Sequence, residues 1–230
     1  MCGRKTLIKN ERSIIKELMV DEWRVDGYEP SYNIAPTQYS PIMVNEKQSR
    51  VVMMMRWGLI PEWSKNDAFA SKMINARCET LRDKPSYKNL VSQNRCIVIA
   101  DGYYEWKKSN KGKIPYYIHH QDGHLLLFAG LWTLWHTRSK PLLTYTIITT
   151  KAQKDIFHIH DRMPLTLEHS DIERWLKGGN EKLDVNDFIE TSQIKLDHHS
   201  VRNLVNYPSN NSKECIAPFN PPDSLDLFSS

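Results

Sequence analysis

Cys2, directly behind the initiator Met1, is the residue best suited to covalent chemistry. Its small size predicts removal of Met1, which would leave a free α-amine and a thiol on one residue. The α-amine has an unperturbed pKa near ~8 and the thiol near ~8.5, so both reach nucleophilic forms close to neutral pH. Such an amine attacks an aldehyde to give a Schiff base, and the thiol can close it into a thiazolidine ring. The alternative is that Cys2 is an incidental residue of a frayed terminus.

A second reactive group is Glu105, which lies among aromatic residues in the stretch 102–106. Desolvation by these rings would raise the pKa of the carboxyl group and suit it to general acid–base work. A structural carboxylate, bonded to nearby backbone or to an arginine, is an equally good interpretation of this segment alone.

Two histidines, His158 and His160, stand beside Asp161 and Arg162 just before a proline. One of the two imidazoles is suited to act as a general acid or base, with a plain loop histidine as the alternative. The His-x-His spacing can be half of a metal site. No Cys or His pair elsewhere completes it, and the four cysteines contain no Cys-x-x-Cys pair, so we expect no metal ion and no cofactor.

Two further stretches carry groups that could contact a ligand. Asn75, Arg77 and Glu79 follow a period of two, so on an extended segment they would share one face. Trp63 lies in a proline-bounded segment that reads as an exposed aromatic loop, where a nucleic-acid base could stack for about 1–3 kcal/mol. Trp57, on a β-rich run, is better explained as a core residue.

The lysines at 107, 108, 111 and 113 flank an expected hairpin tip. Their spacing favours a solvated tip over a binding site. The net charge of +4 is mild, and it permits an anionic partner without requiring one.

The length of 230 residues corresponds to one large domain or at most two small ones, and the apolar content is ordinary. No apolar run is long enough to cross a membrane, and the N-terminus has no secretory signal. We therefore expect a cytoplasmic, reduced location, which keeps a nucleophilic thiol usable.

Strand patterns fill the middle of the chain and helix patterns lie towards its ends. This order predicts an α+β fold with a strongly bent, barrel-like, mainly antiparallel β-sheet core flanked by short helices. We expect one domain over residues 1–207 and a loosely ordered tail over 208–230. The expected elements are a helix over 11–21 capped by Asn10, strands over 51–57, 96–100 and 142–149, a hairpin of 115–119 with 125–129 around a turn at 121–123, a helix through 176 with a Ser170/Glu173 capping box and an end at 178–179, a short helix over 185–191, and a strand beginning at 194–196.

Taken together, the motifs resemble the SOS-response-associated peptidase family of abasic-site sensors, in family order over roughly residues 1–205. One departure is Lys5, where the family usually carries an aromatic residue, and it leaves the packing beneath the first strand open. The matching stretches are Met1–Arg4, Tyr32–Thr37, Arg56–Pro61, Ile74–Thr80, Asp101–Trp106, Phe128–Trp132, Thr146–Thr150 and Ile159–Pro164.

The resemblance implies a protein that binds single-stranded DNA and traps the aldehyde of an abasic site on Cys2 as a thiazolidine. It implies a monomer in the cytoplasm that associates with the nucleoid when bound to DNA. The implied catalytic residues are Cys2, Asn75 to orient, Glu105 to manage protons, His160 as a proton donor and Thr149 as a supporting hydroxyl. The implied DNA-binding residues are Arg4, Arg77 and Arg162 on the flanking phosphates, with Asn33, Pro36 and Trp63 along the DNA path.

Two alternatives stay open from the sequence. Cys2 with His160 and Asn75 or Glu105 could instead form the nucleophile, base and orienting group of a cysteine peptidase that acts on other proteins. A nucleic-acid-binding module without chemistry would explain the arginines and tryptophans, but not Cys2, Glu105 and His160 together.

Overall fold

The computed structural model describes residues 2–110, 112–136, 140–177, 183–191 and 194–219. Five strands form a closed barrel, because β5 pairs with β4, β4 with β7, β7 with β10, β10 with β11, and β11 again with β5. Only the closing β5–β11 contact is parallel within this ring. The ring strands are β4 (Tyr39–Glu46), β5 (Ser49–Trp57), β7 (Arg95–Ala100), β10 (Leu126–His136) and β11 (Pro141–Lys151).

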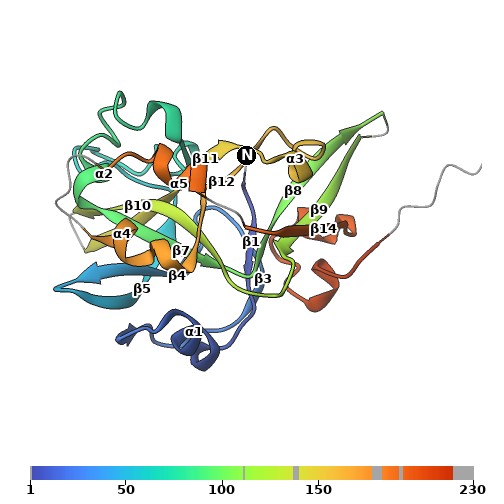
Figure 1. Ribbon diagram of the computed structural model, residues 1–230, viewed down its shortest axis with the longest axis horizontal. Helices are drawn as coiled ribbons and strands as arrows, with labels where there is room; N and C mark the ends of the chain where they lie inside the picture. The colour runs from blue at the N-terminus through green and yellow to red at the C-terminus, as the bar shows by residue number, and fades with distance from the viewer. Residues whose placement is uncertain (1, 111, 137–139, 178–182, 192–193, 220–230) are drawn as a thin grey trace, which may run out of the picture.

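Four short strands extend the barrel: β2 (Glu22–Arg24) on β5, β6 (Asn75–Arg77) and β12 (Arg162–Pro164) on β11, and β13 (Thr166–Leu167) on β10. A second, wholly antiparallel sheet lies beside the barrel (Figure 1). Its order is β14 (Leu196–Ser200), β9 (Gly112–His120), β8 (Gly102–Ser109), β1 (Lys5–Leu7) and β3 (Ser31–Ile34).

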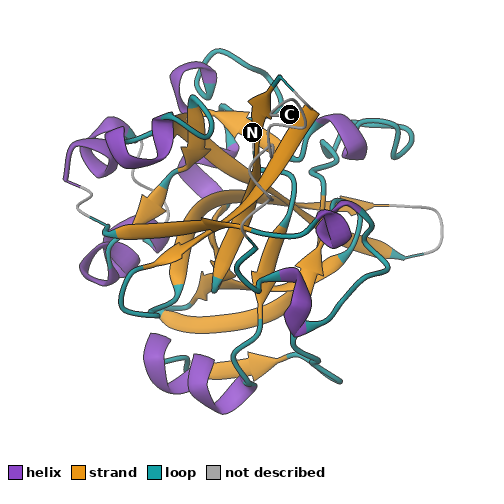
Figure 2. Cartoon of the chain, turned by 90° about the vertical axis from the view of Figure 1, so that its right-hand side faces the viewer, coloured by secondary structure: helices purple, strands orange, loops and turns teal. Residues whose placement is uncertain are grey.

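The described helices are short and lie around the outside of the strands (Figure 2). Asn10 caps the first of them by accepting a hydrogen bond from the backbone N–H of Ser13 at 2.9 Å, as predicted. The α+β class with a bent, mainly antiparallel core is therefore confirmed. The helices are α1 (Glu11–Leu18), α2 (Leu90–Gln93), α3 (Lys154–Phe157), α4 (Ile172–Leu176) and α5 (Asn186–Thr191).

The barrel interior is the main hydrophobic core. All six residues of β7 are buried, which its continuous apolar run predicts for a strand covered on both faces. Trp57 is fully buried and stacks on Tyr145 with ring centroids 6.1 Å apart, which confirms its interpretation as a core residue. No helix in the described ranges is long and apolar enough to span a bilayer.

The predicted hairpin of 115–119 with 125–129 is wrong, although both segments are strands. Residues 121–123 do form a turn, but this turn carries the chain from one sheet to the other. β9 pairs with β8 across a tight tip, whereas β10 is inserted between β7 and β11 in the barrel. The apolar alternation of each strand was visible in the sequence, but its pairing partner was not, because that choice depends on non-local burial.

Helix boundaries also differ from the predictions. The first helix ends at Leu18 because Met19 adopts a left-handed conformation and residues 22–24 join the sheet. The predicted capping box at Ser170 is wrong: Ser170 lies inside a 3-10 turn, and Glu173 binds Arg50 instead of the helix terminus. The helix end expected at 178–179 lies outside the described residues.

Residues 208–219, which the sequence places in a loosely ordered tail, are packed against the second sheet. Cys215 is fully buried there, and the side chain of Asn211 accepts a hydrogen bond from the backbone N–H of Tyr32 at 2.6 Å. Val201 and Pro218 form an isolated bridge. Residues 220–230 lie outside the described ranges.

Candidate active site

The N-terminal segment lies at the junction between the barrel and the second sheet. β1 pairs with β8 through Lys5 and Tyr103, and the backbone N–H of Tyr104 donates to the carbonyl of Arg4 at 3.0 Å. From the barrel side, the side-chain amide of Asn75 donates to the carbonyl of Cys2 at 2.6 Å. Cys2 is thereby fixed between elements of both sheets.

The Cys2 thiol is fully buried, and its Sγ lies 3.8 Å from the carbonyl of Arg4. Burial raises the pKa of the thiol to about 12, with a further contribution from the negative charge of Glu105. In the chain that still carries Met1, the thiol is therefore protonated at neutral pH.

Glu105 lies on β8 and is only 2% exposed. Burial raises the pKa of its carboxyl group to about 7, as the aromatic setting of residues 102–106 predicts. Both protonation states are accessible near neutral pH, which is the range in which a general acid or base works best.

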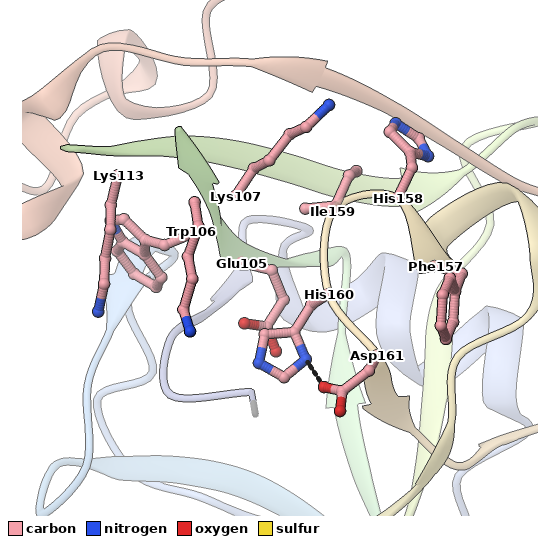
Figure 3. Close-up of a pocket in the computed structure, with 10 residues that line it drawn as sticks. Glu105, Trp106, Lys107, Lys113, Phe157, His158, Ile159, His160 and Asp161 are labelled. Atoms are coloured by element: carbon pink, nitrogen blue, oxygen red, sulfur yellow. Dashed lines mark ion pairs between the residues drawn. The ribbon is translucent and has the colours of Figure 1, made fainter. Parts of the chain in front are cut away.

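Glu105 and His160 line the same pocket, which has a volume of about 490 Å³ and is shown in Figure 3. His160 follows α3, and Figure 3 shows its imidazole beside the Glu105 carboxyl group. The pairing of these two residues, far apart in sequence, fits an acid–base site. The other lining residues are Trp106, Lys107, Lys108, Lys113, Phe157, His158, Ile159 and Asp161.

His160 Nδ1 has two contacts that favour different protonation states. The backbone N–H of Arg162 donates to Nδ1 at 3.0 Å, which suits a neutral ring. The Asp161 carboxylate lies 3.0 Å from the same nitrogen and suits an imidazolium. Burial lowers the pKa of His160, so the neutral imidazole is favoured. The Asp161 carboxylate acts in the opposite direction and would stabilise the imidazolium when the ring takes up a proton.

Thr149 and Arg162 form a structural pair beside this pocket. Arg162 donates to the carbonyl of Thr149 at 2.6 Å and to its hydroxyl at 3.3 Å. It also makes two hydrogen bonds to the Glu79 carboxylate, at 2.5 and 3.0 Å. The expected shared face of residues 75, 77 and 79 is wrong, because the strand turns into a 3-10 helix at Cys78 and redirects Glu79 towards Arg162.

Arg4 and Asn33 take part in a hydrogen-bond network that joins the second sheet to residues 205–210 of the C-terminal segment. Asn33 is 1% exposed, and its amide donates to the carbonyls of Val205, Tyr207 and Asn210. Its oxygen accepts a hydrogen bond from Arg4 at 2.8 Å. Both the nitrogen and the oxygen of the Asn33 side chain are used in this network, so the structure does not place this side chain on an open surface.

The remaining predicted DNA-binding residues lie apart from the pocket. Trp63 is 61% exposed and packs edge-on against Phe69, with ring centroids 5.6 Å apart, as expected for an exposed aromatic loop. Arg77 is exposed at the end of β6, and Pro36 is half-buried in a turn.

Lys5, at the position where the family usually carries an aromatic residue, is fully buried beneath β1. Its Nζ donates to the Ser40 hydroxyl at 2.7 Å and to the carbonyl of Ile99 at 2.9 Å. Burial lowers the pKa of this ammonium to about 7. A titratable amine thus lies within the core, close enough to Cys2 for its charge, when present, to lower the pKa of the thiol.

The sequence interpretation missed the pocket wall formed by Lys108 and Lys113. The signal was available in the hairpin, because a tip near Gly112 places residue 108 opposite residue 113. Within the described ranges, no cluster of His, Cys, Asp or Glu is arranged to hold a metal ion.

This fold and site define a known class of protein. The family model for the SOS response associated peptidase (SRAP) matches residues 1–208, and the chain belongs to that family. It is 41% identical to the abasic site processing protein YoqW of Bacillus subtilis, over 94% of this chain and 99% of the relative. It is 34% identical to the abasic site processing protein HMCES of Gallus gallus, over 86% of this chain and 69% of the relative.

Solved structures share the fold. A Bacteroides thetaiotaomicron protein superposes with a TM-score of 0.83 at 24% identity, covering 95% of this chain and all of the other. A phage-related protein of Bordetella bronchiseptica superposes with a TM-score of 0.66 at 27% identity, covering 87% of this chain and 94% of the other.

Proposed function

We propose that this protein, after loss of Met1, binds single-stranded DNA and traps an abasic site on Cys2 as a thiazolidine. The observation that carries the proposal is the placement of Cys2. Asn75 holds it at 2.6 Å, within electrostatic reach of Glu105, and Glu105 shares a pocket with His160. The names of the relatives, which are abasic site processing proteins, support the choice of substrate.

The reaction begins at the Cys2 α-amine, because the thiol is the less available nucleophile. The amine adds to the aldehyde carbon to give a carbinolamine, and loss of one water gives the imine. Glu105 accepts a proton from the attacking amine. His160 donates one proton to the ring oxygen as the sugar opens and, after taking up another from solvent, one to the departing hydroxyl, which leaves as water.

The thiol then adds to the imine carbon and its proton passes to the nitrogen, so the net reaction releases one water. Ring closure removes the protonated imine, which would otherwise acidify the neighbouring carbon and promote strand breakage by β-elimination. A thiol is required for this step, since a hydroxyl would give a more labile oxazolidine.

A cysteine peptidase acting on other proteins is the competing function. The relatives' names, which are abasic site processing proteins, favour the crosslinking function. Removal of Met1 by the protein itself would be a separate use of its proteolytic chemistry.

A denaturing gel tests the proposal. The purified protein is incubated with an oligonucleotide that carries one abasic site, with Cys2→Ala and intact DNA as controls. The proposal predicts a slow, heat-resistant band that requires both the lesion and Cys2. No such band, from protein whose mass shows that Met1 is gone, would leave the peptidase or a plain binding module as the better account.

A further inference from the structure

The hairpin of β8 and β9 places two lysines side by side. Lys108 and Lys113 are directly opposite in the antiparallel register, so their side chains leave the same face at neighbouring positions. Like charges at such positions repel each other and destabilise a hairpin. Within the described residues neither lysine side chain makes an ion pair or a hydrogen bond, and both residues are exposed.

This pair lies at the edge of the candidate active site. Both lysines line the pocket that holds Glu105 and His160, and the charge of Lys108 acts on the His160 ring. In Figure 3, Lys113 lies on the same side of β8 as Trp106, whereas Lys107 points to the opposite side of the strand. The two lysines therefore lie at the pocket that contains the proposed acid–base residues Glu105 and His160.

Two of the three arginines expected on the flanking phosphates are committed elsewhere. Arg4 donates to Asn33 and to the carbonyl of Val205, and Arg162 is held by Glu79. Only Arg77 presents an exposed guanidinium. A polyanionic strand that enters the pocket needs cations beside it, and the hairpin supplies them.

We propose that Lys108 and Lys113 bind the phosphodiester backbone of the DNA strand where it crosses the β8–β9 hairpin next to the abasic nucleotide. This inference rests on the proposed function and adds a backbone-binding surface to it. It replaces the interpretation of these lysines as a solvated tip. Lys107 also lines the pocket, but its side chain points away from that of Lys113 in Figure 3, so it is not part of the proposed pair.

The test is equilibrium binding of an intact, fluorescently labelled single-stranded oligonucleotide over a series of salt concentrations. The variant Lys108→Gln/Lys113→Gln is compared with Lys16→Gln/Lys47→Gln, which removes the same charge from exposed lysines on α1 and at the β4–β5 turn. Each phosphate contact on single-stranded DNA contributes about −0.7 to the slope of log affinity against log salt. Loss of two contacts should reduce the slope by about 1.4, and Lys108→Arg/Lys113→Arg should retain it.

The outcomes separate this inference from the proposed function. A reduced slope in the hairpin variant but not in the control supports the lysine surface. Equal slopes in the hairpin variant, the control and the unmodified protein overturn the lysine surface alone, whether or not the crosslink still forms. If the unmodified protein binds no single-stranded DNA, both the lysine surface and the proposed function are wrong.

Discussion

The side-chain amide of Asn75 donates a hydrogen bond of 2.6 Å to the backbone carbonyl of Cys2. These residues are 73 positions apart, and the bond joins the N-terminal segment to β6 at the edge of the barrel. A reactive N-terminus would otherwise be free to fray. The bond therefore holds the Cys2 backbone in place, and the proposed function uses this position for the α-amine that loss of Met1 would release.

Replacement of Asn75 should slow crosslinking more than it weakens binding. Asn75→Ala removes the donor to Cys2, and a misplaced nucleophile costs on the order of 10²-fold in rate. Single-turnover crosslinking measures the rate, and anisotropy measures affinity for intact DNA. Asn89→Ala, at an exposed position, is the matched control. A normal rate in Asn75→Ala would show that this bond does not position the nucleophile.

Glu105→Gln should stabilise the protein while it slows the reaction. The folded-state pKa of about 7 exceeds the ordinary value of 4.5, so the folded protein binds more protons than the unfolded chain between these values. The ionised carboxylate therefore destabilises the fold, by about 3 kcal/mol above pH 7 and by almost nothing well below pH 4.5.

Chemical denaturation of Glu105→Gln at pH 4 and pH 8 measures this difference. We expect a gain in the free energy of unfolding at pH 8 only, together with a loss of crosslinking rate. A variant that is less stable at pH 8 would show that Glu105 is a structural carboxylate, which is the alternative the sequence left open.

Lys5 should make stability depend on pH in the alkaline range. Its pKa is lowered from 10.5 to about 7, so between these values the unfolded chain binds more protons and stability rises with pH. The penalty of the buried ammonium is fully present below pH 7, on the order of 4 kcal/mol. Lys5→Met should remove the rise in unfolding free energy between pH 7 and 10. An unchanged profile would mean that Lys5 does not titrate in this range.

Asn33→Ala should destabilise the fold rather than weaken DNA binding directly. Its amide serves three backbone carbonyls of the C-terminal segment, and leaving buried acceptors unpaired should cost about 2–4 kcal/mol. Asn45→Ala is the control, since Asn45 makes one exposed hydrogen bond. If Asn33→Ala retains its stability but loses affinity for single-stranded DNA, then Asn33 contacts the DNA directly, as the resemblance implies.

Much of the candidate site could be predicted from local chemistry. Cys2 was identified from its position and its two nucleophiles, and Glu105 from the aromatic residues around it. Both predictions depend on short segments whose environment is visible in the sequence. Asn33 could not be assigned in this way, because its partners at 205–210 are brought to it only by the fold.

The fold shows the same division between local and non-local information. The strands at 51–57, 96–100 and 142–149 were predicted from their apolar runs, and the cap at Asn10 from its residue type. The partner of each strand was not predictable, because closing the barrel through β5 and β11 joins residues far apart in the chain. The lysines at 108 and 113 were interpreted as a solvated tip for this reason, since the pocket beside them is formed only by the fold.

The most direct test of the central claim is the chemistry of the crosslink itself. Protein lacking Met1 is reacted with abasic single-stranded DNA, with and without borohydride, and is then digested. The mass of the N-terminal peptide is measured by mass spectrometry. If Cys2 carries a thiazolidine, the peptide mass should increase by the mass of the sugar fragment minus one water, and borohydride should not change this increase. The Cys2→Ser variant, in contrast, should keep its adduct only after reduction with borohydride. An adduct on another residue, or one on Cys2 that gains two hydrogens on reduction, would contradict thiazolidine formation.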